Sequence, residues 1–293
     1  NPTIDIRTFC ENHIIQIHKK GIKSLNFEFE WNSSEKDVVA GSIGNEYVIA
    51  VLNDMSVVLF DRNLQLVEGD EQAATLDAVE GKITAVTFCN SYVAVATVIE
   101  DSDNGINIGS GNDGKKGSLT IFSTDFDRIH SQIFLLSSVV SLVFDSETQY
   151  LYASTTNGHV LTWRFDTSGY IDNDLCTTIF INQNSPSSLV QIGLDLLIAN
   201  DDGLFIYDTK KLSFAPIQIG RLLALCAVDN DSFFALMHGS LEIYRVRITR
   251  ETSSLLKNFE FPLTKSPRRL VCTDDLIVGL VRMRKDTESY LGF

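Results

Sequence analysis

A repeated hairpin pattern constrains the fold of this chain more than any other feature. Each copy has an apolar run that often opens with an aromatic residue, then a polar or glycine turn, then a second apolar run with an aromatic residue near its end. The copies lie at residues 47–61, 92–122, 150–166, 196–208 and 233–246, with turns at Asp54, Gly117, Gly158, Gly203 and Gly239. The same spacing predicts a sixth copy with its turn at Glu11.

The last three intervals between turns are 41, 45 and 36 residues, and the first interval of 63 shortens toward the same range once the polar insertion at 101–116 is set aside. Four-stranded units of about 40 to 45 residues are typical of β-propeller blades. Glycine at the turns supplies the positive φ that tight hairpins require. Helical periodicity is nearly absent, and the WD dipeptide of WD repeats is not repeated. We therefore predict an all-β, seven-bladed β-propeller that is WD-repeat-like but non-standard, with Trp31 and Trp163 packed between blades.

The glycine-rich stretch GSGNDGKK at residues 109–116 is similar to a phosphate-binding loop, but its neighbours argue against that role. A phosphate loop leads into a helix whose N-terminus faces the phosphates. Here the next residues, GSLTIFSTDF, are alternating and β-branched, which predicts a strand. The stretch DSDNG from Asp101 also lacks the closing glutamate of a calcium loop. We interpret residues 101–116 as a long, solvated hairpin loop.

Composition narrows the range of partners. The net charge is −14, whereas affinity for nucleic-acid phosphates comes mainly from clustered Lys and Arg, so free-standing nucleic-acid binding is disfavoured. No apolar run approaches the roughly 18 residues of a membrane span. The five cysteines are scattered without a C-x-x-C pair, which predicts reduced thiols in strands and no zinc site; they are Cys10, Cys89, Cys176, Cys226 and Cys272.

The residues give no sign of a catalytic site. A hydrolase brings a nucleophile, a base and an orienting acid together, whereas His159 and His238 stand at hairpin turns without a nucleophile motif. The pairs Asp201–Asp202 and Asp274–Asp275 also stand at predicted turns, and adjacent side chains on extended chain point apart. We predict a protein that is not an enzyme, with no catalytic, cofactor-binding or metal-binding residue and no cofactor.

Three segments resemble the CPSF-A family of multi-propeller proteins. FEFPLTKSPRRLVC at 259–272 resembles the family's PL-x-x-[ST]-PR-[KR] segment, which leads out of the second propeller. HIIQIHKKGIKSLN at 13–26, followed by Glu30–Trp31, resembles its [IV]-Q-[IV]-x-x-x-G-[IL]-[RK] strand and downstream Glu-Trp. KKLSFAPIQIGRLLALCAVDND at 210–231 resembles its F-x-x-x-P-[IL] stretch and last hairpin. The three segments occur in the family's order.

The resemblance implies a division of the chain into two parts. Residues 1–262 would form about six blades of the family's second propeller, and residues 263–293 would cross into the next one. Because the chain starts without methionine and stops in mid-pattern, we expect a fragment of a multi-propeller protein. Phe261 is expected to be buried in the last blade, Pro267 to turn the chain out, and Arg268 and Arg269 to lie at the junction.

The resemblance also implies a non-catalytic protein–protein interaction scaffold in a nuclear complex. Gly21-Ile22-Lys23 with the Glu-Trp pair, and VVLFDRN at 57–63, are most similar to the large propeller subunit of splicing factor 3b, which implies pre-mRNA splicing and branch-site recognition beside HEAT-repeat and small zinc-finger subunits. That subunit's Ser-Arg-x-Trp strand is absent at 198–207. A cullin-RING ubiquitin ligase adaptor in the DNA damage response is therefore an alternative. Either role implies only indirect contact with RNA or DNA and no membrane or small-molecule substrate.

A third possibility is a propeller enzyme or small-ligand binder that uses the central channel. Such a site would need convergent polar groups at matching positions of several blades. The turn residues do not show that pattern. We therefore favour the interpretation that the protein is a non-catalytic scaffold.

Overall fold

All regular elements that the computed structural model describes are β-strands. The described residues are 3–10, 13–67, 76, 79, 81–99, 116–126, 128–171, 176–181, 187–200, 202–217, 222–227, 232–237, 242–248, 253–260, 269–272, 277–282 and 288–292. Within these ranges there is no helix long and apolar enough to cross a membrane.

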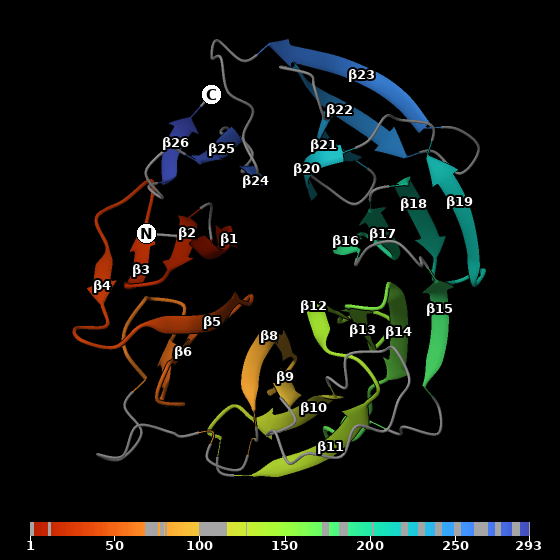
Figure 1. Ribbon diagram of the computed structural model, residues 1–293. Coiled ribbons are helices and arrows are strands. Elements are labelled where there is room, and N and C mark those ends of the chain that lie inside the picture. The colour runs from red at the N-terminus through yellow and green to blue at the C-terminus, as the bar shows by residue number, and fades with distance from the viewer. Residues whose placement is uncertain are drawn as a thin grey trace, which may run out of the picture.

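The strands form antiparallel sheets arranged in a ring around a central axis (Figure 1). Blade 1 contains β1 (Thr3–Phe9), β2 (His13–His18), β3 (Gly21–Ser24) and β4 (Glu30–Asn32), and blade 2 contains β5 (Val38–Ile43), β6 (Val48–Leu52) and β7 (Val57–Phe60). Blade 3 contains β8 (Lys82–Cys89), β9 (Tyr92–Ile99), β10 (Lys116–Ser123) and β11 (Ile129–Leu135). The first strand of each blade is nearest the axis and the last is on the outer rim (Figure 1).

The second half of the chain continues the ring in the same order. Blade 4 contains β12 (Val139–Asp145), β13 (Tyr150–Thr155), β14 (His159–Arg164) and β15 (Thr177–Ile181). Blade 5 contains β16 (Ser188–Ile192), β17 (Asp195–Asn200), β18 (Gly203–Asp208) and β19 (Ser213–Ile217). Blade 6 contains β20 (Leu222–Ala227), β21 (Ser232–Met237), β22 (Glu242–Ile248) and β23 (Ser253–Glu260). A last sheet contains β24 (Arg269–Cys272), β25 (Ile277–Arg282) and β26 (Glu288–Gly292).

The predicted all-β propeller is confirmed, but the predicted seven blades are wrong, because six blades are formed. The outer position of blade 2 is occupied by an isolated bridge between Phe60 and Leu66, which completes that blade. The sheet β24–β26 has three strands and no fourth strand among the described residues, so we do not count it as a blade. It contacts β20 and β1 and closes the ring between blades 6 and 1 (Figure 1). The sequence count went wrong because it assumed four strands for every repeat.

The predicted division at residue 262 stays a prediction. Phe261, Pro267 and Arg268 lie outside the described residues, and only the backbone of Arg269 is described, at the start of β24. The contacts of β24 with β20 and β1 place the β24–β26 sheet in the ring.

Not all the predicted turns are equivalent. Asp54, Gly158 and Gly203 lie at the turn between the second and third strands of their blades, as predicted. Gly117 instead lies inside β10, where it pairs with Val98, and Gly239 lies outside the described residues. Glu11, also outside them, falls between the first and second strands of blade 1. The equivalent turn of that blade is the next one, at Lys19–Lys20, so the repeat was assigned one strand early.

The hydrophobic core consists of clusters between neighbouring blades. Trp163 is fully buried between blades 3 and 4, among residues that include Leu119 and Leu151. Trp31 is partly buried at the junction of blades 1 and 2, with its ring 5.5 Å from that of Phe60. Both tryptophans therefore pack between blades, as predicted. Because each sheet is covered by its two neighbours, the second strands of blades 1 to 5 are buried along most or all of their length.

An aromatic–aspartate pair ends the third strand of blades 2, 4 and 5. The buried aromatic residues are Phe60, Phe165 and Tyr207, and the aspartates that follow are Asp61, Asp166 and Asp208. Each aspartate accepts two backbone N–H bonds through Oδ1, with distances between 2.8 and 3.0 Å, from residues of the following turn. The aromatic side chain anchors the strand in the core while the carboxylate holds the turn. The pair recurs at one place in three blades, with Phe or Tyr where a Trp-Asp dipeptide would have Trp.

Candidate interaction surfaces

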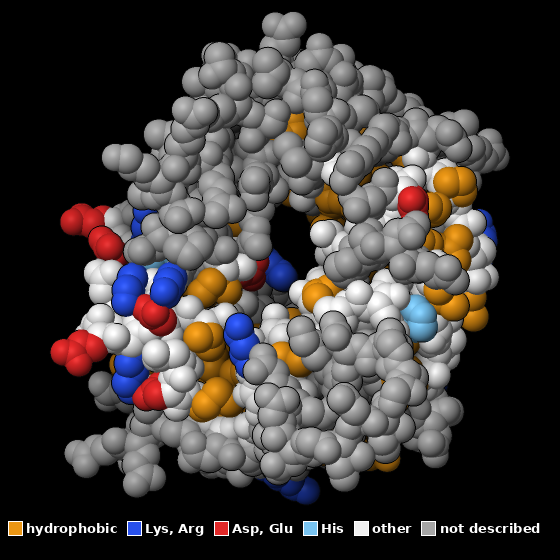
Figure 2. All heavy atoms as spheres, viewed as in Figure 1, with side chains coloured by type: hydrophobic (Ala, Val, Ile, Leu, Met, Phe, Trp, Pro, Cys, Tyr) orange, Lys and Arg blue, Asp and Glu red, His pale blue; other side chains and the backbone are white. Residues whose placement is uncertain are grey.

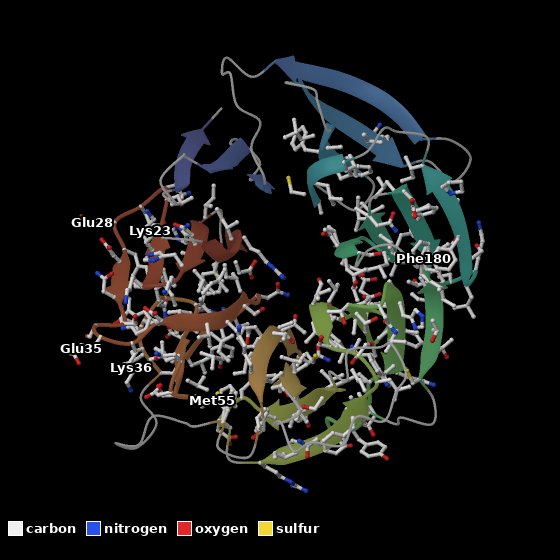
Figure 3. The ribbon with its side chains drawn as sticks, viewed as in Figure 1. Lys23, Glu28, Glu35, Lys36, Met55 and Phe180 are labelled. Carbon is white, nitrogen blue, oxygen red and sulfur yellow. The ribbon has the colours of Figure 1, made fainter. Side chains whose placement is uncertain are left out.

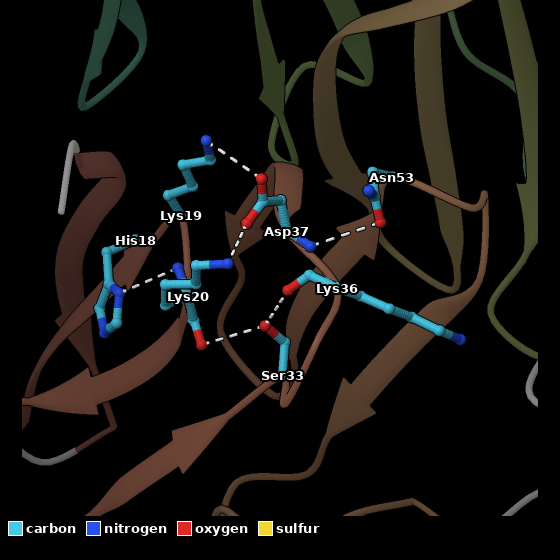
Figure 4. A network of polar contacts seen from close by, with 7 residues as sticks. All are labelled: His18, Lys19, Lys20, Ser33, Lys36, Asp37 and Asn53. Carbon is cyan, nitrogen blue, oxygen red and sulfur yellow. Dashed lines mark hydrogen bonds and ion pairs between the residues drawn. The ribbon is translucent and has the colours of Figure 1, made fainter.

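A network of charged and polar side chains covers the ends of blades 1 and 2 on one face of the ring (Figure 2). We call it the charged network and define it as His18, Lys19, Lys20, Ser33, Lys36, Asp37, Asn53 and Asp54. Its members come from the β2–β3 turn, the β4–β5 link and the β6–β7 turn. Seven of them are drawn in Figure 4.

Backbone bonds bring these three segments together. The N–H of Ser33 donates to the carbonyl of Lys20 at 2.9 Å, and the N–H of Val38 donates to the carbonyl of Lys19 at 2.8 Å. The hydroxyl of Ser33 lies 3.1 Å from the Lys20 carbonyl and 2.5 Å from the Lys36 carbonyl. The link from blade 1 to blade 2 is therefore tied to the β2–β3 turn, which brings Asp37 of the link next to Lys19 and Lys20 (Figure 4).

Asp37 lies between two lysines. Its carboxylate is 3.0 Å from Nζ of Lys19 and 2.5 Å from Nζ of Lys20, and its N–H donates to Oδ1 of Asn53 at 3.3 Å. These bonds from Lys20 and Lys19 lower the pKa of Asp37. Two ammonium groups thus share one carboxylate, which leaves a surplus of positive charge at this turn.

Lys36 and Asp54 extend the network into blade 2. Their charged groups are 2.5 Å apart, and Asp54 also accepts from the N–H and hydroxyl of Ser56. The Lys36 ammonium and then the Ser56 hydroxyl lower the pKa of Asp54 to about 2. Burial, followed by the nearby charge of Lys23, lowers the pKa of His18, whose Nδ1 accepts from the N–H of Lys20. At neutral pH the network therefore carries three positive and two negative charges.

The charged network suits recognition better than structural support. Its lysine and aspartate side chains are between about a quarter and a half exposed, and exposed ion pairs stabilise a fold by only about 0–1 kcal/mol each. Their positions, however, are set by backbone bonds. Glu35 lies in the same link, so the surface as a whole carries mixed charge, and Lys19 and Lys20 are the cations that a partner's carboxylates would meet.

Aromatic side chains fill the junctions between blades at their outer edges. Blades diverge with distance from the axis, so large side chains are needed there to keep neighbouring sheets in contact. At the junction of blades 4 and 5 we define the aromatic wedge as Phe180, Phe205, Tyr207 and Phe214. The ring of Phe180 lies 5.1 Å from that of Phe205 and 5.6 Å from that of Phe214, which is itself 4.8 Å from Tyr207.

The aromatic wedge is partly open to solvent. Phe214 is 38% exposed, and hydrophobic side chains gather over this rim in Figure 2, at the right of the view. Figure 3 shows Phe180 across the ring from Lys36, so the aromatic wedge and the charged network are separate surfaces.

The described residues of the sequence motifs lie at turns and strand ends. His159 begins β14, and its N–H donates to the hydroxyl of Thr155. Asp202 follows the β17 strand, and its N–H donates to Oδ1 of Asn200. His238, Asp201, Asp274, Asp275 and residues 101–115 lie outside the described residues. Among the described residues no three His, Cys, Asp or Glu side chains are grouped as metal ligands would be.

The four cysteines whose side chains are described are free thiols, as predicted. Cys10, Cys89, Cys176 and Cys226 form no disulfide. Cys89 is fully buried, and burial raises the pKa of its thiol. Only the backbone of Cys272 is described, in β24.

Sequence reasoning missed both surfaces for different reasons. The Lys19–Lys20 pair was visible, but the repeat had been assigned one strand early, so the pair was not recognised as a turn beside Asp37. The aromatic wedge joins β15, β18 and β19, which come from two blades. The aromatic residues near the ends of the repeats were a signal for it, but their partners depend on how the blades stack.

The architecture defines the class of protein as a β-propeller, and this class is consistent with a scaffold role. The family can be stated as well. The sequence model of the RSE1/DDB1/CPSF1 second β-propeller matches residues 1–250. The chain belongs to this family, which is the CPSF-A family that its sequence resembles, and whose propellers are of the scaffold type.

Two solved structures are similar in fold. A chain of the crystal structure of the mitotic checkpoint complex has a TM-score of 0.62 at 8% identity, over 98% of this chain and 88% of that one. The Cps50 (Swd1) β-propeller domain of Myceliophteria thermophila has a TM-score of 0.61 at 12% identity, over 99% of this chain and 95% of that one. A comparison with the curated proteins finds no match. At such low identity the two structures support the propeller fold alone.

Proposed function

We propose that this propeller is a non-catalytic, protein-binding part of a nuclear complex of the splicing factor 3b type, acting in pre-mRNA splicing at branch-site recognition. The observation that carries the proposal is the family match over residues 1–250. The choice of this member is supported by Gly21-Ile22-Lys23 with Glu30–Trp31 and by VVLFDRN at 57–63. The partners would be a HEAT-repeat protein and a small zinc-finger subunit.

A second candidate is an adaptor subunit of a cullin-RING ubiquitin ligase that acts in the DNA damage response. The observation that favours it is the β17–β18 segment, where IANDDGLFIY replaces the splicing subunit's Ser-Arg-x-Trp strand. Both candidates use the same scaffold and differ in what the scaffold binds.

Affinity purification of the protein from its own cells, followed by quantitative mass spectrometry, separates the two. Recovery of a HEAT-repeat protein with a small zinc-finger protein is the expected result. Recovery of a cullin in their place would establish the second candidate, and recovery of neither would contradict both.

A charge-reversal variant tests whether the charged network contributes to partner binding. In Lys19→Glu/Lys20→Glu, both cations beside Asp37 become carboxylates, and we expect partner recovery to fall. The matched control is Arg62→Glu, which reverses an exposed charge at the opposite ends of the strands, where Arg62 pairs with Glu46. Equal recovery of the partner proteins with both variants would show that the charged network does not contribute to partner binding.

A further inference from the structure

The outer strand β15 is an edge strand, and none of the described strands pairs with its outer side. It is the last strand of its sheet, and its sequence TTIFI contains no proline and no charged residue. Such edges present unpaired backbone groups to any extended chain, and most proteins protect them with charge, proline or short length. The outer strands of two other blades are protected in these ways: β19 contains Pro216, and β4 has three residues including Glu30.

The end of β15 adjoins the aromatic wedge. Phe180 is the fourth residue of β15 and stacks against Phe205 and Phe214 of blade 5. Its neighbour Ile181 is 60% exposed, and Thr177 and Thr178 are exposed as well. A chain paired with β15 would therefore carry alternate side chains past apolar surface.

Two lysines stand beside the same apolar surface. The turn that leads from β18 to β19 contains Lys210, Lys211 and Leu212, and Leu212 is 69% exposed. The carboxylate of Asp208 shapes this turn by accepting from the N–H groups of Lys210 and Lys211. Lys211 pairs with Asp208 at 3.4 Å, whereas no ion pair of Lys210 is found among the described residues. The turn thus has a net positive charge on an acidic chain.

We propose that β15 and the aromatic wedge bind an extended segment of a protein partner that alternates apolar with acidic side chains. The segment adds a strand to the edge of β15, its apolar side chains cover Phe180, Phe214 and Leu212, and its carboxylates pair with Lys210 and Lys211. Strand addition supplies affinity through backbone hydrogen bonds, and the apolar surface and lysines supply selectivity. A single-stranded nucleic acid fits less well, because two lysines offer few phosphate contacts.

This inference rests on the proposed scaffold role, and its test is independent of the identity of the complex. The probe is a synthetic peptide that alternates isoleucine and glutamate, with a matched peptide that has lysine in place of each glutamate. Binding to the full chain is measured by fluorescence anisotropy. We expect the glutamate peptide to bind at least about tenfold more tightly than the lysine peptide, since like charges facing each other oppose association. An oligouridine probe serves as the nucleic-acid comparison.

Backbone pairing is tested on the peptide itself. Two versions are N-methylated, one at the odd and one at the even residues. Because alternate residues of a strand direct their N–H groups to opposite edges, one version should lose binding and the other keep it. Equal binding of both versions would overturn strand addition.

Variants of the protein test the side chains. Lys210→Glu/Lys211→Glu should reverse the preference between the two peptides, and Leu212→Ser/Phe214→Ser should weaken both. Leu136→Ser is the matched control, since Leu136 is a highly exposed leucine of the β11–β12 link, at a different junction. Equal effects of the control and the wedge variant, an unchanged peptide preference, or tighter binding of oligouridine would overturn the proposal. If the Leu212→Ser/Phe214→Ser variant unfolds, the peptide preference of the Lys210→Glu/Lys211→Glu variant still tests the proposal.

Discussion

At the scale of single residues, carboxylates position the surface of this propeller. Asp61, Asp166 and Asp208 hold turns on one side of the ring through backbone N–H bonds, and Asp37 and Asp54 orient lysines on the other. Each side chain acts on its own neighbours. We therefore expect substitutions at these positions to change local turns and binding while the ring persists.

The first prediction concerns Asp166. Its Oδ1 accepts from the N–H groups of Ser168 and Tyr170 at 2.8 and 2.9 Å and from the Ser168 hydroxyl at 2.7 Å. Asp166→Ala should lower the free energy of unfolding by about 1–2 kcal/mol, because these donors lose their acceptor. Asp166→Asn keeps an Oδ1 acceptor and should cost less. Urea denaturation of both variants gives the comparison, and an unchanged free energy of unfolding in Asp166→Ala would show that the carboxylate does not hold the turn.

The second prediction concerns acid stability. The pKa of Asp54 is about 2 in the folded chain and near 3.8 without its partners. A lowered folded-state pKa contributes stability that is fully present above about pH 4 and is lost as the pH falls toward 2. The unfolding free energy of the natural chain should therefore fall more steeply between about pH 4 and 2 than that of Asp54→Asn. Parallel curves in a pH series of urea denaturations would contradict this assignment.

At the scale of strands and hairpins, close approach of backbones determines which positions tolerate a side chain. Gly21 begins β3 with φ +153°, and a Cβ atom there would lie 2.0 Å from the carbonyl oxygen of Trp31 in β4. Gly203 begins β18 with φ +141°, and a Cβ atom there would have no atom within 4 Å. The two glycines have a similar positive φ but differ in their surroundings.

Gly21→Ala should therefore destabilise the chain more than Gly203→Ala. The backbone strain is similar at both sites, so the difference reflects the clash, which requires β4 to move away from β3 and costs about 1–3 kcal/mol. Thermal unfolding of the two variants measures this difference. Equal melting temperatures would mean that β4 moves away from β3 without loss of stability.

A further element-scale prediction concerns the segment between β9 and β10. Ile99 and Lys116 face each other as a pair at the end of the β9–β10 hairpin, so the two strands are already joined where residues 100–115 begin and end. Replacing 100–115 with Asn-Gly should leave the melting temperature nearly unchanged, because a two-residue turn suits this register. A loss of cooperative unfolding, or of nucleotide-dependent stabilisation shown by the parent, would contradict the hairpin-loop interpretation.

At the scale of the whole molecule, stability depends on neighbouring blades covering each other. The sheet β24–β26 contacts both β20 and β1, so it covers the blades on either side of the closure (Figure 1). Deleting residues 261–293 should expose apolar faces of blades 1 and 6, with aggregation or a lower melting temperature as the result. Light scattering after gel filtration detects this, with the 100–115 replacement as a control that leaves the blades intact. A monomeric truncated chain that melts at the parent's temperature would contradict ring closure by this sheet.

The sequence by itself determined the all-β character, the blade-length repeat, the burial of Trp31 and Trp163, and the family, because alternation, turn residues and local motifs are written along one strand or hairpin. The number of strands in each sheet could not be determined from the sequence alone. Leu66 completes blade 2 through one bridge to Phe60, whereas β24–β26 forms a three-stranded sheet that closes the ring. The two surfaces also required tertiary structure. Lys20 meets Asp37, and Phe180 meets Phe214, across segments 17 and 34 residues apart, and only the stacking of separate blades brings such pairs together.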